Sequence, residues 1–164
     1  MDDSNSDPED ENTVFEGNYM SNIAPQLHYG FNGSGGLWYK AERWVQDDVV
    51  GDSREVWIFS GGIVLDDRSP ETVGGNNSIY VPDLYYKVVI MDTGEEFPKV
   101  ITFLFPHFDA KEDYKEKDIL KYTVSVDYLE ALTGYNFFNE YSEAFQVEYE
   151  AIGYDKDYWI AFFP

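Results

Sequence analysis

A carboxamide and a carboxylate flank a short glycine-rich segment in the first third of the chain. Asn32 lies within the glycine-rich residues 30–36, and Glu42 lies in the segment that follows. Carboxamide and carboxylate oxygens are hard donors that suit Mg²⁺, and a helix N-terminus favours a phosphate group. The two side chains are therefore candidates for metal-assisted chemistry on a phosphate.

The elements that would position these side chains are a loop and a helix. Pro25 and the glycine-rich residues 30–36 do not fit regular structure, so this part of the chain predicts a shaped loop. From Leu37 the apolar residues recur at helical spacing, which predicts a short amphipathic helix ending near residues 47–48. Trp38 and Glu42 are one helical turn apart, so Asn32 and Glu42 could converge at the entrance of this helix.

Several phrases resemble the DNA/RNA non-specific endonucleases related to the Serratia nuclease. They occur in the family's order from about residue 21 to residue 138, which makes the resemblance specific although each phrase alone is weak. The phrases are Ser-Asn-Ile-Ala-Pro-Gln (21–26), the Phe-Asn at 31–32, Trp-x-x-x-Glu (38–42), Val-Trp-Ile-Phe-Ser-Gly (56–61), Pro-Asp-Leu-Tyr-Tyr-Lys-Val-Val (82–89), Phe-Leu-Phe-Pro (103–106) and the run from 122 to 134.

This resemblance implies a ββα-metal site of the His-Me finger type. Asn32 would be the direct protein ligand of one Mg²⁺ or Mn²⁺ ion, and Glu42 would hold a metal-bound water. Asn22 and Gln26 match positions that support the loop. The family's general base is the histidine of an Asp-Arg-Gly-His phrase ahead of the Ser-Asn phrase, and this sequence contains no such phrase.

Each candidate also has an interpretation without function. Asn is common in glycine-rich loops because it tolerates left-handed backbone angles, and Glu42 beside Lys40 and Arg43 resembles an ordinary solvated helix face. The only histidines, His28 and His107, match no functional position of the family, and we expect both at the surface.

Composition limits the class of protein. The chain of 164 residues is 43 % hydrophobic and 18 % aromatic, which predicts one folded domain over residues 13–164. No apolar run is long enough to span a membrane, and the absence of cysteine excludes disulfides and thiolate metal sites. Residues 1–12 are rich in Asp and Glu and predict a disordered acidic tail.

The expected fold is α+β, an antiparallel sheet flanked by short helices, like a ββα-metal nuclease that lacks its N-terminal part. We expect a buried strand over 55–60, broken by Gly61 and Gly62 and resumed at 63–65, and a polar loop over 66–77. Further strands are expected at 79–81, at 84–91 with its antiparallel partner at 99–105, and at 122–126. Trp57 and the tyrosines and phenylalanines of these strands are expected in the core.

The last predicted helices follow residue 126. Asp127 is the expected N-cap, with Glu130 completing a capping box, and Gly134 is the expected C-cap. Another helix is expected over 140–149, and the aromatic residues 158–163 should pack onto the body.

The sequence favours a Mg²⁺-dependent endonuclease of DNA and RNA, here a fragment without its base histidine. We expect the natural reading frame to extend upstream of Met1 and to encode the Asp-Arg-Gly-His phrase, and the chain alone to be nearly inactive. The alternatives are an inactive family member that serves as an acidic binding or inhibitory module, or a purely structural domain. By resemblance the protein would be secreted or periplasmic and could form a homodimer.

The net charge of −21 gives a testable prediction. Nucleic-acid binding rests mainly on Lys and Arg, so the acidity suggests either adaptation to salt or loss of nucleic-acid handling. If the acidity is an adaptation to salt, the thermal unfolding midpoint should rise between low and molar NaCl, because salt screens repulsion between like charges. Circular dichroism melts would test this, and a flat or falling midpoint would contradict it.

Overall fold

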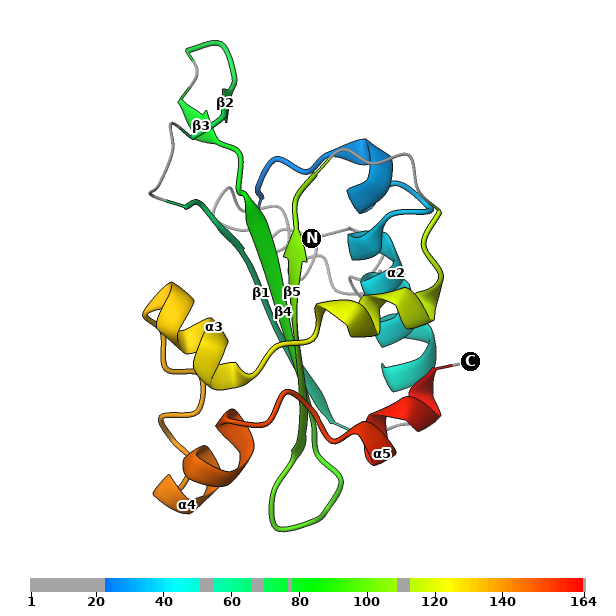
Figure 1. Cartoon of the computed structure of the whole chain (residues 1–164), viewed down its shortest axis with the longest axis vertical. Coiled ribbons are helices and arrows are strands. Elements are labelled where there is room, and N and C mark those ends of the chain that lie inside the picture. The colour runs from blue at the N-terminus through cyan, green and yellow to red at the C-terminus, as the bar shows by residue number, and fades with distance from the viewer. Residues whose placement is uncertain (1–22, 51–54, 66–69, 77, 109–112, 164) are drawn as a thin grey trace, which may run out of the picture.

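The computed structural model describes residues 23–50, 55–65, 70–76, 78–108 and 113–163 (Figure 1). The expected acidic tail and Asn22 lie outside the described residues. The helical segments are η3 (His28–Asn32), α2 (Leu37–Trp44), η4 (Val45–Val49), η6 (Glu116–Tyr122), α3 (Val126–Thr133), α4 (Glu143–Phe145), η7 (Gln146–Glu150), α5 (Lys156–Trp159) and η8 (Ile160–Phe162). The strands are β1 (Val56–Ile63), β2 (Thr72–Val73), β3 (Ile79–Tyr80), β4 (Leu84–Met91) and β5 (Lys99–Pro106).

A three-stranded antiparallel sheet in the order β1-β4-β5 forms the centre of the fold. Leu84 pairs with Pro106 and Met91 with Lys99, so the predicted hairpin between the fourth and fifth strands is confirmed. Strand β4 is buried along almost its whole length because helices cover both faces of the sheet. The predicted α+β class with short flanking helices is therefore correct.

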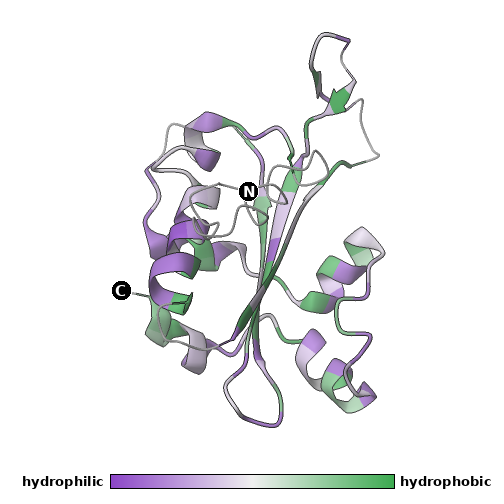
Figure 2. Ribbon diagram, turned by 180° about the vertical axis from the view of Figure 1, so that it is seen from behind, coloured by the Kyte–Doolittle hydropathy of each residue, from purple (hydrophilic) through white to green (hydrophobic). Residues whose placement is uncertain are grey.

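Alternate residues of β4 belong to two separate hydrophobic clusters. Tyr85 and Val89 pack in the first cluster with α2, η6 and α5, whereas Tyr86 and Val88 pack in the second with α3 and α4. Figure 1 shows these two groups of helices on opposite sides of the strands. In Figure 2 the helices on both sides carry hydrophilic and hydrophobic stretches, as expected for helices with one buried face.

Strand β1 differs from its prediction in two ways. It continues through Gly61 and Gly62 to Ile63 rather than breaking at the glycines, and Trp57 is 39 % exposed rather than part of the core. The glycines are explained by close packing, because a Cβ on Gly61 would lie 2.7 Å from the ring of Tyr86 on β4. The strand is exposed because, among the described residues, only β4 pairs with it.

The loop expected over residues 66–77 also contains regular structure. The short strand β2 lies within that range and pairs with β3 in a two-stranded sheet. Strand β3 falls within the strand expected at 79–81, whereas β2 has only two residues and is too short to give a clear alternating pattern in the sequence.

The strand expected over residues 122–126 is wrong. Within it only Thr123 pairs with the sheet, as an isolated bridge to Phe103, and the residues before it form the helical segment η6. The N-cap of α3 is Ser125, whose hydroxyl accepts a hydrogen bond from the Tyr128 backbone N–H at 3.1 Å. The expected cap, Asp127, lies in the first turn instead.

Glu130 does not complete a capping box. Its carboxylate accepts a hydrogen bond from the backbone N–H of Phe137 at 2.7 Å. The predicted C-cap Gly134 is confirmed, with a φ of 73° that favours glycine.

The C-terminal elements agree with their predictions. The helix expected over 140–149 is present as α4 and η7. Trp159 is fully buried and donates from its indole N–H to the carbonyl of Val100 at 3.0 Å, while the indole N–H of Trp44 donates to the carbonyl of Phe162 at 2.9 Å. The aromatic end of the chain therefore closes the first cluster.

Membrane insertion of a helix has no support in the described part of the chain, where every helix is too short or too polar to cross a bilayer.

Gly36 provides a test of how the loop and α2 fit together. A Cβ at this position would overlap the backbone of Phe31, so Gly36→Ala should lower the free energy of unfolding by about 1–3 kcal/mol. Gly75→Ala is the matched control, because a Cβ there has no atom within 4 Å. Urea unfolding of both variants measures the difference, and equal stabilities would contradict this packing.

Candidate metal centre

The segment before α2 is held on the sheet by hydrogen bonds to two side chains. The hydroxyl of Tyr85 donates to the carbonyl of Pro25 at 2.7 Å. The backbone N–H of Leu27 donates to Nε2 of His107 at 2.8 Å, and Nδ1 of His107 lies 2.7 Å from the carbonyl of Pro82. Because Nε2 accepts, Nδ1 carries the proton and donates to Pro82, so His107 is neutral in this arrangement.

Phe31 fixes the same segment by packing. Its side chain is fully buried, and its ring centre lies 4.6 Å from that of His107, 5.0 Å from that of Tyr85 and 5.8 Å from that of Trp38. A buried phenylalanine surrounded by three rings has little freedom to move. The backbone of the next residue, Asn32, is therefore held in a fixed place beside α2.

His107 corrects one of the predictions. It was expected at the surface, but it is half-buried between the loop and the sheet and bonded through both nitrogens. Burial is the main cause that lowers its pKa, and the hydrogen bond to Pro82 opposes this effect. The sequence carries no periodic signal at this position, because its partners are backbone atoms far away along the chain.

His28 is exposed, as predicted. Its ring lies close to the loop that carries Asn32. A Cβ added to Gly33 would lie 3.2 Å from Cε1 and 3.3 Å from Nε2 of His28.

Asn32 lies at the end of η3 and is exposed. Its backbone N–H donates to the carbonyl of Leu27 at 3.0 Å, whereas its carboxamide makes no hydrogen bond to any described residue. Five residues later α2 begins at Leu37, after its N-cap Gly36, as the sequence predicted. The structure thus presents a carboxamide to solvent directly before a helix N-terminus.

Glu42 is half-buried on α2 and is held by Trp38. The indole N–H of Trp38 donates to Oε1 of Glu42 at 2.7 Å, across one helical turn. The same indole stacks on Phe31, whose backbone continues into Asn32. The rings of Trp38 and Phe31 thus connect Glu42 with the backbone that carries Asn32, and the convergence of the two side chains stays a prediction.

Lys87 is a buried cation beside this arrangement, and sequence reasoning did not single it out. It is 5 % exposed, its Nζ lies 4.2 Å from the centre of the Trp38 ring, and it donates to the hydroxyl of Ser60 at 3.4 Å. Burial lowers its pKa to about 8, while the negative charge of Glu42 opposes this shift. The phrase Tyr-Tyr-Lys-Val-Val was the only available signal, since a lysine within a buried strand is rare.

Of the remaining predicted residues, Gln26 is half-buried in the anchored loop between Pro25 and Leu27. Its supporting role stays a prediction.

The donors of this arrangement fit a hard divalent cation. Asn32 offers a carboxamide oxygen that no described residue occupies, and Glu42 is a carboxylate in the field of the buried Lys87 ammonium. Neutral and anionic oxygens of this kind, supplemented by water, are the usual surroundings of Mg²⁺. Glu42 bonds to Trp38, which suits a residue that orients a water better than one that binds the ion itself.

The antiparallel sheet with flanking helices and this loop-helix arrangement define a fold of the ββα-metal nuclease type. The chain belongs to the DNA/RNA non-specific endonuclease family, whose model matches residues 5–144. Enzymes of this family are nucleases that depend on a divalent metal and act on nucleic acids.

One solved structure supports the fold independently. It is a chain in the crystal structure of the EndoG/EndoGI complex, a structure on the mechanism of EndoG inhibition, with a TM-score of 0.63 and 23 % sequence identity. The match covers 79 % of this chain and 54 % of that chain, so the protein spans about half the length of this neighbour. No curated protein sequence matches this chain.

Lys87 gives a pH test of the site. Its pKa of about 8 in the folded state lies below its ordinary value of 10.5, so the unfolded state binds more protons between these pH values and stability rises with pH. The free energy of unfolding should gain about 2 kcal/mol from this residue between pH 7 and pH 10.

Lys87→Met removes this contribution and leaves all other titrating groups in place. The difference between the wild type and this variant therefore isolates the effect of Lys87. Urea unfolding at pH 7 and pH 10 should show the gain in the wild type relative to Lys87→Met. A difference between the two proteins that does not change with pH would contradict the lowered pKa.

Proposed function

We propose that this chain provides the metal-binding part of a Mg²⁺- or Mn²⁺-dependent endonuclease that hydrolyses phosphodiester bonds of both DNA and RNA. The observation that carries the proposal is the exposed carboxamide of Asn32 at the end of η3, next to α2 with Glu42, in a chain of this family. Family membership gives the reaction class, and the local geometry supports the choice of residues.

Each residue has a definite part in this proposal. Asn32 is the direct protein ligand of the ion, and Glu42 holds and orients a water molecule. Trp38 fixes the carboxylate of Glu42 through its indole N–H, and Lys87 places a positive charge near it. The bound ion supplies charge stabilisation for the phosphate and for the leaving oxygen.

The printed sequence contains no Asp-Arg-Gly-His phrase, so it lacks the histidine that serves as general base in the family. A general base typically contributes about 10²–10⁴-fold to the rate. We therefore propose that the chain as printed binds the ion but cleaves nucleic acid only very slowly.

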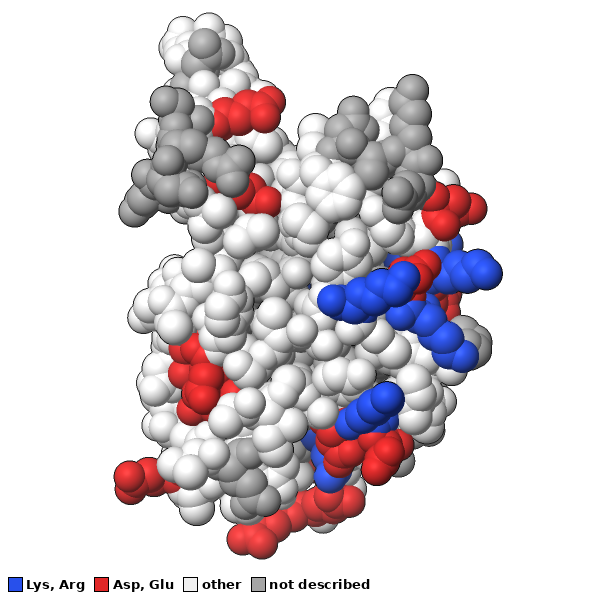
Figure 3. All heavy atoms as spheres, viewed as in Figure 1, with Lys and Arg blue, Asp and Glu red and all other residues white. Residues whose placement is uncertain are grey.

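The charge distribution supports a nucleic-acid substrate better than the net charge does. Lys and Arg side chains gather over η6 and α5 in Figure 3, with some acidic side chains among them, and further acidic side chains lie over α3 and α4. Segment η6 packs against α2, and Lys117 and Lys121 lie on it next to Lys115, all three exposed. Local basic charge of this kind can contact phosphates although the whole chain is acidic.

The alternative is an inactive family member that acts as an acidic binding or inhibitory module. The net charge of −21 favours it, because such a surface imitates a nucleic acid toward basic partners. A module of this kind would capture basic proteins and need no Mg²⁺, so metal binding distinguishes the two proposals.

Asn32→Ala tests the metal site. The variant should lose Mg²⁺ and Mn²⁺ binding in titration calorimetry and keep the circular dichroism of the wild type, because the exposed carboxamide contributes little to packing. Asn76→Ala is the matched control, since Asn76 is also an exposed asparagine in a glycine-containing turn.

Unaltered metal binding in Asn32→Ala would remove this residue from the site. A wild-type chain that binds no metal at all, but does bind basic proteins, would favour the acidic module over the nuclease.

A further inference from the structure

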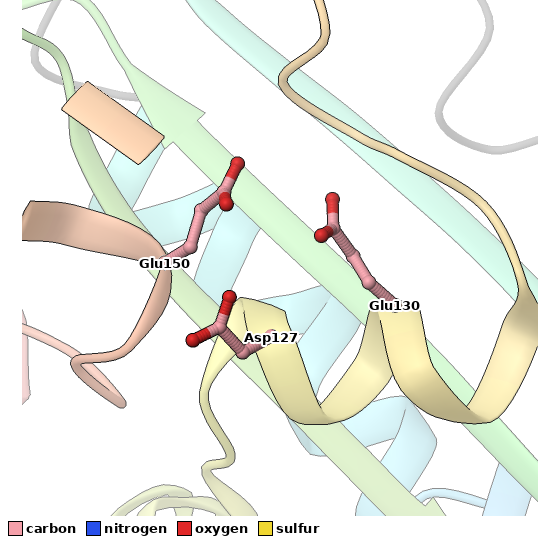
Figure 4. Close-up of side chains that lie close together, drawn as sticks. All are labelled: Asp127, Glu130 and Glu150. Carbon is pink, nitrogen blue, oxygen red and sulfur yellow. The ribbon is translucent and has the colours of Figure 1, made fainter. Parts of the chain in front are cut away.

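Three carboxylates meet on the side of the sheet away from α2. Asp127 and Glu130 come from α3, Glu150 is the last residue of η7, and oxygens of all three lie within 4.8 Å of one another. Figure 4 shows the three side chains turned toward a common space between the two segments. None of these residues takes part in the arrangement around Asn32 and Glu42.

The fold brings them together through caps and aromatic packing. Ser125 caps α3, so Asp127 falls in the first turn and Glu130 lies one turn further along the same helix face. On the other segment, Phe145 is fully buried and stacks on Tyr149 with ring centres 4.9 Å apart. This stacking directs the chain so that Glu150 faces α3, with which η7 is in contact.

Glu150 is the observation that separates this cluster from ordinary surface acidity. The residue is only 6 % exposed, and its Oε1 is buried without a hydrogen-bond partner. Leaving a buried carboxylate oxygen without a partner is costly. Burial raises the pKa of Glu150, and the charges of Glu130 and Asp127 raise it further, so the three groups repel one another.

Protein groups of the described part of the chain do not compensate this negative charge. The ion pairs among these residues join Arg43 with Asp47, Lys99 with Glu95 and Asp155, and Lys121 with Asp118, all outside the cluster. One oxygen of Glu130 accepts from the Phe137 backbone N–H at 2.7 Å, which fixes that carboxylate in place. The unpartnered oxygen of Glu150 therefore faces two further carboxylates and lacks a positive group.

We propose that Asp127, Glu130 and Glu150 form a binding site for a Ca²⁺ ion that joins α3 to η7. Carboxylate oxygens alone, without nitrogen or sulfur donors, select a hard cation. Ca²⁺ takes six to eight oxygens in flexible geometry, so three carboxylates together with water suit it. Asp127 is exposed, which leaves room for such water at the outer side of the site.

The role of this ion is structural rather than catalytic. The cluster belongs to the second hydrophobic group, around Val126, Leu129 and Phe145, while the candidate metal centre belongs to the first. The buried strand β4 lies between the two groups. A bound Ca²⁺ ion links residues near 127 with residue 150 and so holds α4 and η7 against the sheet.

Thermal unfolding with and without Ca²⁺ tests the proposal, in EDTA and then in Ca²⁺ at about 0.15 M NaCl to suppress unspecific cation binding. The midpoint should rise by about 5–10 °C once free Ca²⁺ exceeds the dissociation constant 100-fold. In Glu150→Gln and Asp127→Asn this rise should be lost. In EDTA both variants should melt at or above the wild-type temperature, because one repelling charge is gone.

Glu140→Gln is the matched control, because it removes the same charge from an exposed residue of the same region and should keep the full Ca²⁺ effect. Asn32→Ala should also keep it. The proposal is overturned if the wild type shows no Ca²⁺ shift, as expected if Glu150 is simply protonated. It is also overturned if the shift survives in Glu150→Gln and Asp127→Asn, or disappears in Asn32→Ala.

Discussion

The burial of Phe31 between the sheet and α2 is the constraint on which the candidate metal centre depends. Its ring contacts Trp38 on α2, Tyr85 on β4 and His107 directly after β5, so a single side chain joins the loop, the sheet and the helix. The hydrogen bonds of Tyr85 and His107 to the loop backbone satisfy polar groups that this burial would otherwise leave without partners. An exposed asparagine can then occupy a defined position, because the residue before it is held by packing against three rings.

Strand β4 links the candidate metal centre to the rest of the molecule, because its side chains belong to both hydrophobic clusters. Because both of its faces are buried, successive side chains enter different hydrophobic clusters, and Lys87 is carried into the first cluster although it is charged. A lysine there is tolerated because Trp38 offers its ring face and Glu42 an opposite charge nearby. The buried cation costs stability at neutral pH, and it places a positive charge near the Glu42 carboxylate.

The sequence predicted those features that follow from local patterns. Residues 37–45 show helical spacing, and the apolar residues at that spacing are all buried, namely Leu37, Trp38, Ala41, Trp44 and Val45. The β4–β5 pairing and the cap at Gly134 also follow from nearby residues. Prediction from the sequence failed where the outcome depends on distant partners. The exposure of Trp57 depends on which strands lie beside β1, and the burial of His107 depends on its hydrogen bonds with Pro82 and Leu27. The cap was misplaced from Ser125 to Asp127 because both residues can cap a helix. The meeting of Glu150 with α3 had no signal in the sequence, since Glu150 lies 20 positions after Glu130.

The difference between local and total charge bears on how an acidic chain can belong to a family that acts on polyanions. A total charge describes the average field, whereas a phosphate in contact with the protein responds mainly to groups within about one Debye length, roughly 8 Å at physiological salt. Lys115, Lys117 and Lys121 lie on or next to the segment packed against α2, while the carboxylates of Asp127, Glu130 and Glu150 lie beyond the sheet. Basic and acidic side chains alternate on η6, where Lys117 and Lys121 lie beside Glu116 and Asp118, so the field at a bound phosphate depends on these few local side chains and not on the total charge.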